Sequence, residues 1–219
     1  MKNLKNALLL KQLYHLKQLG YTYTSVVPFK ENEPDLKLPN TLETLKKQAT
    51  ECHLCILSKS RNKVVFGEGH PHAKLMIVAD VPSDNDDING RIFTGRSGEL
   101  LTKMLENVLE LSREDVYITN LLKCHALDSH SPSPANVHTC YPYVLKEIEL
   151  VKPSMILSMG ELAYSYLSND DTPLEKVRGS TFVQEQYTLI PTYHPNYLLR
   201  NPSAKKEVFA DLLKLKGLL

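Results

Sequence analysis

Short apolar runs alternate with amphipathic stretches along most of this chain, and the alternation predicts the order of its strands and helices. The apolar runs are rich in Val, Ile and Leu and lie at residues 64–66, 75–80, 116–122, 155–160 and 188–194. Apolar residues at helical spacing predict helices near 97–111, 137–150, 160–168 and 203–216. Continuous apolar strands between helices are typical of a mostly parallel sheet that is covered on both faces. The pattern therefore predicts an α/β fold.

Residues 1–39 precede this region and have a different pattern. Leucines at near-helical spacing within residues 4–18 predict an amphipathic helix, and the prolines that follow indicate a linker. Asn40 and Glu43 have the spacing of a helix N-cap and its N3 partner, which predicts one further helix. We expect two parts: an N-terminal helix with its linker at 1–39, and the α/β domain at 40–219.

Length and charge narrow the classes of protein that this chain can represent. A chain of 219 residues can bury a sizeable core without disulfides. Its formal net charge is +1, so a nucleic acid would have to be held by a local basic patch rather than by the field of the whole protein. The apolar run at 7–10 is too short for a signal peptide or a membrane span. We therefore expect a cytoplasmic protein that does not contact membranes and keeps its thiols reduced.

The four cysteines have a spacing that favours a metal site. Cys52 and Cys55 form a C-x2-C pair, and Cys124 and Cys140 follow much later. Such a pair lets two thiolates reach one ion or cluster from a single turn, while the later cysteines close the site. A zinc ion is the main alternative to an iron–sulfur cluster, because three histidines that could also bind zinc lie near the cysteines in the sequence: His53, His125 and His138. From the residues alone, an iron–sulfur cluster, a zinc ion and unligated buried thiols all stay open.

Polar residues stand at the carboxyl ends of the predicted strands. We place these ends at Asp80, at Asn120 with Lys123 and Cys124, at Gly160, and at His194 with Pro195. Ligands of open α/β sheets bind beyond the carboxyl ends of the strands. We therefore expect a carboxylate, a carboxamide and an imidazole to converge on one crevice.

The acidic loop "VADVPSDNDDINGRIFTG", residues 78–95, allows simpler interpretations. A calcium loop of the EF-hand type is disfavoured, because the position that requires a bidentate glutamate is Arg96. A phosphate cradle is also disfavoured, since the loop has no Gly-rich run and carries several carboxylates. A solvated acidic turn and one wall of a catalytic pocket are the interpretations that stay open.

A series of motifs between residue 52 and about residue 200 resembles one enzyme family. In chain order they are "CHLC", "ADVPS", Asp86–Asp87, "GRIFTGRSGELL", "ITNLLKC", Cys140 and "HPNYLLR". In order and spacing they resemble the motifs of the iron–sulfur uracil-DNA glycosylases, the family 4 branch of the uracil-DNA glycosylase superfamily. The resemblance implies a three-layer α/β/α domain with a central, mostly parallel four-stranded sheet, preceded here by the N-terminal helical extension.

The resemblance also implies an activity and a cofactor. It implies a monofunctional DNA glycosylase that hydrolyses the N-glycosidic bond of deoxyuridine in single- or double-stranded DNA, releases uracil and leaves an abasic site in base excision repair. It further implies a [4Fe-4S] cluster on Cys52, Cys55, Cys124 and Cys140. We expect the enzyme to act as a monomer.

The residue types at the strand ends suit this chemistry. Cleavage of the N-glycosidic bond builds positive charge on the sugar and negative charge on the base, so a site needs an anion near the sugar and a donor near uracil O2. The resemblance assigns the anion to Asp80 and the donor to His194. Asn120 can contact the uracil edge at two points, a pattern that cytosine reverses. Phe93 resembles the aromatic residue that stacks on the uracil ring.

Residues at and beyond the last motif are candidates for contact with DNA. Leu198 and Leu199 resemble an apolar wedge that holds open the gap left by a flipped base. The candidate phosphate contacts are the basic residues Lys123, Arg200, Lys205 and Lys206.

The departures from the family pattern lie in one loop. The family sequence "GEAPG" is replaced by "ADVPS", so the family glutamate corresponds to Asp80 and the last glycine to Ser83. Aspartate keeps the charge but is shorter by one methylene group, and Asp84 is an alternative carboxylate. Ser83 would lie at the uracil pocket and can change its shape. An iron–sulfur DNA-binding relative with lost or altered base specificity is therefore the alternative function, and a zinc-stabilised nucleotide-binding domain is a weaker one.

Overall fold

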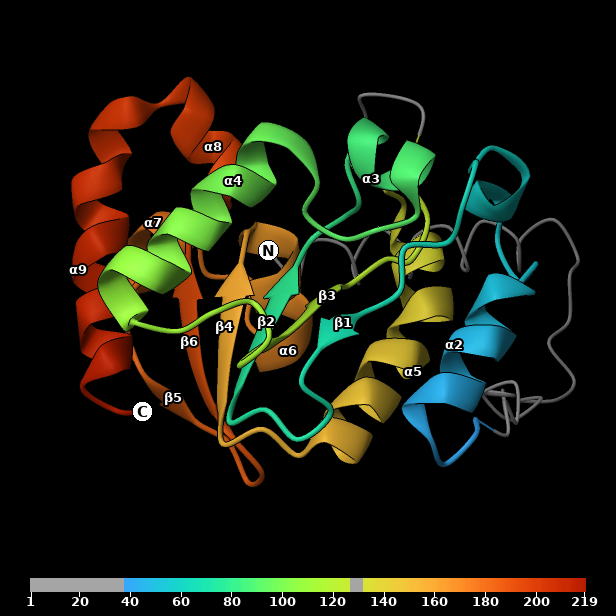
Figure 1. Cartoon of the computed structure of the whole chain (residues 1–219), viewed down its shortest axis with the longest axis horizontal. Helices are drawn as coiled ribbons and strands as arrows, with labels where there is room; N and C mark the ends of the chain where they lie inside the picture. Colours follow the sequence, from blue (N-terminus) through green and yellow to red (C-terminus); the bar gives the residue numbers. More distant parts are fainter. Residues whose placement is uncertain (1–37, 127–131) are drawn as a thin grey trace, which may run out of the picture. The chain divides into compact units, whose positions relative to one another are not determined.

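A central sheet organises the computed structural model, which describes residues 38–126 and 132–219 (Figure 1). Its order is β1-β3-β2-β4-β6-β5. The strands are β1 (Glu68–Gly69), β2 (Leu75–Ala79), β3 (Tyr117–Asn120), β4 (Met155–Met159), β5 (Phe182–Val183) and β6 (Thr188–Thr192). The inner strands β3, β2, β4 and β6 are parallel, and the two edge strands are antiparallel to their neighbours. The prediction of a mostly parallel four-stranded centre is confirmed.

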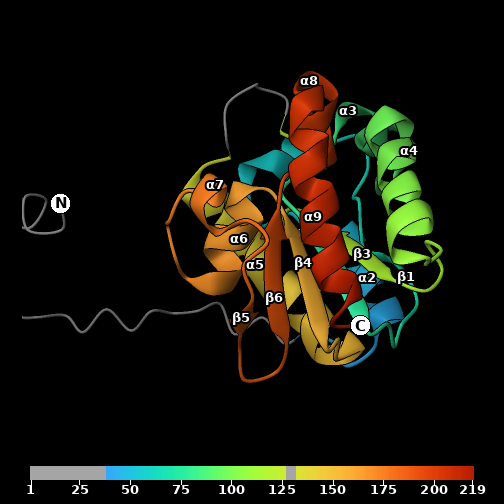
Figure 2. The same cartoon turned by 90° about the vertical axis from the view of Figure 1, so that its left-hand side faces the viewer.

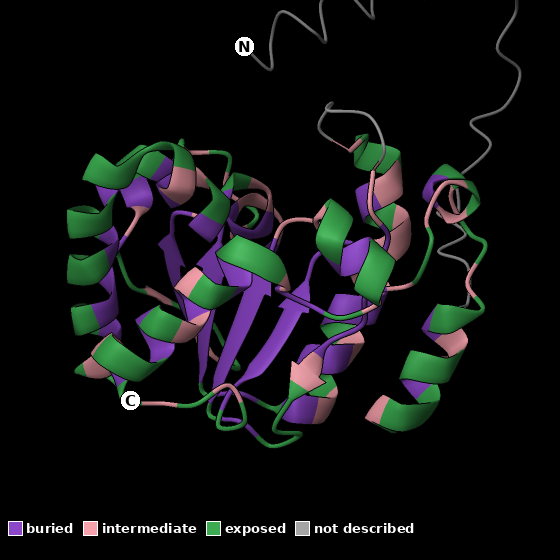
Figure 3. Ribbon diagram, turned by 45° about the horizontal axis from the view of Figure 1, so that its top comes forward, coloured by how far each residue is buried: buried purple, intermediate pink, exposed green. Residues whose placement is uncertain are grey.

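The inner strands are buried along almost their whole length, with only Thr188 of β6 partly exposed. Every residue of β2, β3 and β4 is buried (Figure 3). Figure 2 shows why: α4 (Gly95–Met104) and α9 (Lys205–Lys216) cover one face, while α5 (Pro134–Val151) and α6 (Glu161–Ser168) cover the other. When both faces of a strand are covered, the residues that point to either face are apolar, so the strand is a continuous apolar run in the sequence. The predicted three layers are therefore present.

The remaining helices are short or lie at the margins of the sheet. They are α2 (Leu42–Thr50), α3 (Asp84–Asn89), α7 (Leu174–Val177) and α8 (Pro195–Arg200), with the single turns η1 (Ile56–Lys59), η2 (Leu105–Leu109) and η3 (Pro202–Ala204). Within the described ranges, no helix is long and apolar enough to cross a bilayer. The helix predicted at 4–18 lies outside the described residues.

Several predicted boundaries are wrong for identifiable reasons. The run at 64–66 is not a strand; Val65 instead donates its N–H to Lys123 O, beyond the end of β3. The N-cap of α2 is Thr41 rather than Asn40, because the Thr41 hydroxyl accepts from the N–H of Thr44. The short helix α3 has no apolar periodicity to reveal it, and a capping box between Ser83 and Asp86 begins it instead.

The strand order creates a crevice at the carboxyl ends of β2 and β4. These neighbours pair in parallel, with Ala79 opposite Met159. From β2 the chain crosses to β3 on one side, and from β4 it continues to β6 on the other side. Such a switch point is where doubly wound sheets bind ligands. The residues that follow the two strands, Asp80 and Gly160, are therefore neighbours at the crevice.

A buried ion pair fastens the segment that follows β3 to α5. The Lys123 ammonium is 2% exposed and pairs with the Glu147 carboxylate, which is fully buried. Lys123 Nζ also donates to Thr119 Oγ1 at 2.6 Å, and Glu147 accepts from Tyr117 Oη at 3.0 Å. The prediction that Lys123 contacts a DNA phosphate is wrong, because its charge is enclosed between a strand and a helix.

We expect Lys123→Met to lower the free energy of unfolding by roughly 3 to 5 kcal/mol, because the Glu147 carboxylate would stay buried without its cation. Adding Glu147→Met to this variant should recover much of the loss, since no isolated charge is left. Lys216→Met is the matched control, because Lys216 pairs with Glu110 on the surface and such pairs contribute less than about 1 kcal/mol. Urea unfolding at neutral pH measures all three, and equal losses for Lys123→Met and Lys216→Met would contradict the expectation.

Candidate active site

A cleft of about 560 Å³ opens at the carboxyl ends of β2, β4 and β6. Its walls include Asp80 and Val81 after β2, Gly160 and Glu161 after β4, and His194 after β6. The outer walls are formed by Pro173, Leu174, Glu175, Tyr193, Asn196, Tyr197 and Arg200. The predicted convergence of strand-end residues on one crevice therefore includes the carboxylate and the imidazole.

The Asp80 carboxylate is fixed at the N-terminus of α6. Its Oδ1 accepts from the N–H of Ala163 at 2.7 Å, so it caps a helix whose own N-cap, Gly160, has no side chain. A side chain at Gly160 would place its Cβ 2.1 Å from Asp80 Oδ2, so only glycine leaves room for this carboxylate. Burial, and to a smaller extent the charge of Glu161, raises the pKa of Asp80 to about 7.

His194 is neutral and has a defined tautomer. It is the N-cap of α8, and its Nδ1 accepts from the N–H of Asn196 at 3.0 Å. This bond assigns the ring proton to Nε2, which is left as a donor. Burial lowers the pKa of His194 to about 4, with the charge of Asp86 opposing the shift. The imidazole can therefore donate a hydrogen bond at neutral pH without carrying a charge.

Phe93 stacks on the His194 ring. The ring centroids are 5.4 Å apart and the planes are inclined by 20°. The backbone of Phe93 has φ of 51°, an uncommon conformation for an aromatic residue. Arg113 donates to the carbonyl oxygens of Ile92 and Phe93, and Gly98 approaches Phe93 O so closely that any Cβ would clash. Arg113 and the close approach of Gly98 thus stabilise the uncommon backbone conformation that sets the orientation of the Phe93 ring.

Asn120 is buried at the end of β3 and has an unused donor. The residue is 1% exposed, and its Nδ2 has no hydrogen-bond partner among the described residues. A buried amide without a partner is costly, and such groups often belong to ligand sites. Neither Asn120 nor Phe93 lines the cleft that contains Asp80 and His194.

The other candidates in the acidic loop have structural partners. The Ser83 hydroxyl accepts from the N–H of Asp86 at the start of α3, so it is engaged in a helix cap. Asp86 in turn accepts from the N–H and hydroxyl of Thr94, which closes the loop. Asp84, the alternative carboxylate, has an 85% exposed side chain and pairs with His125 Nε2 at 2.8 Å. It does not line the cleft.

The four cysteines line one small enclosed cavity with Arg61 and Tyr143. All four thiols are free. Arg61 Nη1 donates to Cys124 Sγ at 3.1 Å, and the N–H of Lys123 donates to Cys140 Sγ at 3.4 Å. Thiol ligands whose sulfurs accept hydrogen bonds in an apolar cavity suit an iron–sulfur cluster. Among the described residues, however, no group of three or more Cys, His, Asp or Glu has the arrangement of a single-ion site.

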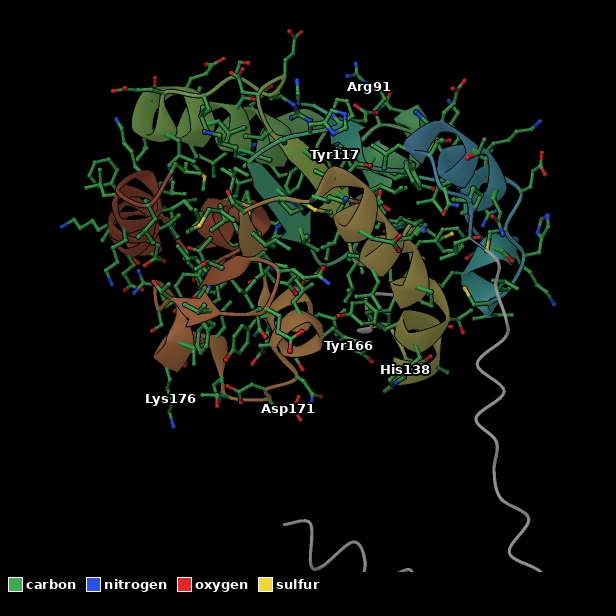
Figure 4. All side chains as sticks on the ribbon, turned by 90° about the horizontal axis from the view of Figure 1, so that it is seen from below. Arg91, Tyr117, His138, Tyr166, Asp171 and Lys176 are labelled. Atoms are coloured by element: carbon green, nitrogen blue, oxygen red, sulfur yellow. The ribbon has the colours of Figure 1, made fainter. Side chains whose placement is uncertain are left out.

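The nearby histidines do not join the cysteines. Both ring nitrogens of His125 have partners, Asp84 Oδ1 and Pro82 O. The His138 ring lies edge-on to Tyr166, with 5.4 Å between centroids, and the two residues lie close together in Figure 4. Neither histidine lines the cysteine cavity, so the structure does not favour the zinc alternative in which they would be ligands.

The residues predicted to contact DNA differ in how far they are exposed to solvent. Leu198 is 1% exposed and belongs to the hydrophobic core, so its prediction as a wedge is wrong. Leu199 is partly exposed and Arg200 is exposed on the same short helix, α8. Lys205 and Lys206 are exposed at the start of α9.

Several polar residues at the site were not among the predicted candidates, Glu161 and Arg113 among them. Glu161 lines the cleft, and only its position directly after a strand-end glycine could have indicated it. Arg113 supports Phe93 from 20 residues away in the chain, and nothing in the local sequence pattern reveals that contact.

Comparison with known proteins agrees with this geometry. The profile of the Uracil DNA glycosylase superfamily matches residues 66–214. The type-4 uracil-DNA glycosylase of Sulfurisphaera tokodaii is 33% identical over 187 residues, which cover 82% of this chain and 85% of that one. The type-4 enzymes of Saccharolobus solfataricus and Thermotoga maritima are 35% and 34% identical, covering 82% and 81% of this chain and 87% and 94% of theirs. The chain belongs to the uracil-DNA glycosylase superfamily, in its type-4 branch.

Proposed function

We propose that this chain is a monofunctional uracil-DNA glycosylase, which hydrolyses the N-glycosidic bond of deoxyuridine in DNA to release uracil and leave an abasic site. The observation that carries the proposal is the neutral His194, which keeps a ring N–H as a donor and lines the same cleft as Asp80. The names of the type-4 relatives support the substrate. All proposed groups come from one chain, which supports a monomer as the active unit.

The two cleft residues match the charges that develop as the bond breaks. His194 Nε2–H would donate to uracil O2 as negative charge builds on the departing base. A neutral imidazole can do this without first giving up a proton to the base. Asp80 would lie on the sugar side, where a carboxylate stabilises positive charge.

Asn120 and Phe93 would recognise the base. The unpartnered Asn120 Nδ2 can donate to uracil O4 while its Oδ1 accepts from N3–H; cytosine presents the reverse pattern. Phe93 would stack on the ring, a contact worth about 1 to 3 kcal/mol. Because Phe93 now lies against His194, a base can enter only when these rings separate. With its hydroxyl in a helix cap, Ser83 would bound the uracil pocket without bonding the base.

The exposed residues of α8 and α9 would contact the DNA. Arg200 lines the cleft, and Lys205 and Lys206 are exposed at the start of the next α-helix, so together they would form a basic edge beside the site. Leu199 is the partly exposed apolar residue on this edge and would fill the gap left by a flipped base. Both single- and double-stranded DNA containing uracil are expected substrates.

Cys52, Cys55, Cys124 and Cys140 would hold the [4Fe-4S] cluster. Their shared cavity and the hydrogen bonds donated to two of the sulfurs support this assignment. When bound, the cluster would cross-link the segments that carry the cysteines. No step of the base-excision chemistry above passes through it.

A second candidate function is an iron–sulfur DNA-binding protein that does not excise uracil. The state of Asp80 favours this second candidate. Its side chain is shorter than that of the family glutamate, it is bonded to the N–H of Ala163, and its raised pKa reduces the negative charge that it can offer to the sugar. DNA binding without uracil release by both the natural chain and Asp80→Glu would support this candidate over the glycosylase.

We expect His194→Ala and Asn120→Ala each to reduce uracil release at least tenfold, because one removes the donor for O2 and the other removes the base contact. A uracil-containing oligonucleotide, treated with alkali after incubation, reports the abasic site as strand cleavage. His72→Ala is the matched control, since His72 is exposed and does not line the cleft. Normal rates in either variant would contradict the role proposed for that residue.

Protein purified without oxygen should contain about four iron and four sulfide ions per chain and absorb visible light. Cys140→Ser should lose both the iron and the absorption, because Cys140 is one of the proposed ligands. Ser60→Ala, an equally small change at a residue that does not line the cavity, should retain both the iron and the absorption. A colourless protein that contains zinc and no iron would contradict the assignment.

Asp80 should make stability fall as pH rises. Its pKa is raised to about 7 in the folded chain from an ordinary value of 3.8, so the folded state holds the proton more tightly. Below pH 4 the group is protonated in both states, and between pH 4 and 7 the stability decreases. Asp80→Asn should therefore raise the free energy of unfolding by roughly 1 to 3 kcal/mol at pH 8 and by almost nothing at pH 4.

Urea unfolding at the two pH values measures this difference. The amide oxygen of asparagine can still accept from Ala163, so the helix cap is preserved in the variant. The control is Asp171→Asn, because Asp171 is exposed and projects from the surface in Figure 4. A gain that is equal at pH 4 and pH 8 would show that burial of the Asp80 charge is not its cause.

A further inference from the structure

Two residues with carboxyl groups line the cleft near the ends of neighbouring strands. Asp80 follows β2 and Glu161 follows Gly160 at the end of β4, and both line the cleft. The parallel register of the two strands, Ala79 opposite Met159, makes Asp80 and Gly160 neighbours, and Glu161 directly follows Gly160. The charge of Glu161 is among the causes that raise the pKa of Asp80. The two groups therefore interact electrostatically across the strand ends.

Asp80 is poorly placed to act as the only anion of the cleft. Its Oδ1 is bonded to the N–H of Ala163, and its Oδ2 lies against Gly160. Because burial raises the pKa of Asp80 to about 7, part of the protein population carries a protonated, uncharged Asp80 at neutral pH. Its structural duty as a helix cap also restricts its movement toward a substrate.

Glu161 has the properties that Asp80 lacks. It is exposed and has no hydrogen-bond or ion-pair partner among the residues that the structure describes. An exposed carboxylate without a protein partner keeps its oxygens available to accept a hydrogen bond from a water molecule. As the first residue of α6 it also lies at the positive end of the helix dipole, which stabilises negative charge. Its side chain is one methylene longer than that of Asp80.

We propose that Glu161 is the catalytic base of the cleft: its carboxylate accepts the proton of the water molecule that attacks the sugar. In this step the water oxygen bonds to C1′, the bond from C1′ to uracil N1 breaks, and its electron pair leaves with the base. One proton of the water passes to Glu161, which later releases it to solvent, and the uracil anion takes a proton from solvent. This inference rests on the proposed glycosylase function.

The other charged and titratable groups of the cleft are less suited to this role. Glu175 lies on α7 and also lines the cleft. Its charge contributes to the raised pKa of Tyr193 but is not among the causes that raise the pKa of Asp80. Arg200 is a cation at the mouth, and Tyr193 and Tyr197 are phenols. His194 is neutral, and its free nitrogen is a donor. Besides Asp80 itself, Glu161 is the carboxylate among these cleft groups that lies near the paired ends of β2 and β4.

We expect Glu161→Gln to lower kcat for uracil release at least tenfold, the lower range for loss of a general base. KM for the oligonucleotide should stay the same or decrease, because the change removes a negative charge that faces a polyanion. Glu161→Asp should retain more activity than Glu161→Gln. Glu175→Gln is the matched control, since it removes the same charge from the same cleft and should leave kcat unchanged.

Binding of an oligonucleotide containing 2′-fluoro-deoxyuridine, which resists cleavage, separates chemistry from folding and recognition. Glu161→Gln should bind this probe at least as tightly as the natural chain. A natural chain that releases uracil, together with an unchanged kcat in Glu161→Gln or an equal loss in Glu175→Gln, would overturn this inference alone. A natural chain that releases no uracil would overturn the proposed function and this inference together.

Discussion

The parallel pairing of β2 with β4 is the constraint on which the site depends. Their register places the residues after the two strands next to each other, so the Asp80 carboxylate occupies the space that a side chain at Gly160 would need. That close approach lets a strand-end residue cap α6, and it brings Glu161 into the same cleft. One pairing therefore determines the position of a helix, the shape of the cleft and the electrostatics of its acidic wall.

The inner sheet and the strand-end residues were predictable because their physical signals are local. A strand buried on both faces is a continuous apolar run, and the polar residue that interrupts it marks the strand's carboxyl end. Asp80, Asn120 and His194 were found in this way. Short elements gave no such signal: α3 depends on a capping box, and β1 and β5 have two residues each.

Contacts between distant segments could not be predicted from one sequence. Nothing in the pattern around Lys123 distinguishes a surface lysine from one that is buried against Glu147, and the same holds for Leu198. The support that Arg113 gives to Phe93 is of the same kind. In each case the residue type is compatible with either environment, and only the packing of elements far apart in the chain decides between them.

The short segment from Asn120 to Cys124 ties together parts of the protein with separate duties. The N–H of Leu121 donates to Ala79 O and that of Leu122 to Asp80 O, while Lys123 bonds Cys140 through its N–H and the Asn120 carbonyl through its ammonium. Each successive residue is thus bonded to a different partner. The number of residues between the base-recognition amide and the cysteine cavity is therefore as constrained as their identity, and this segment should tolerate no insertion or deletion during evolution.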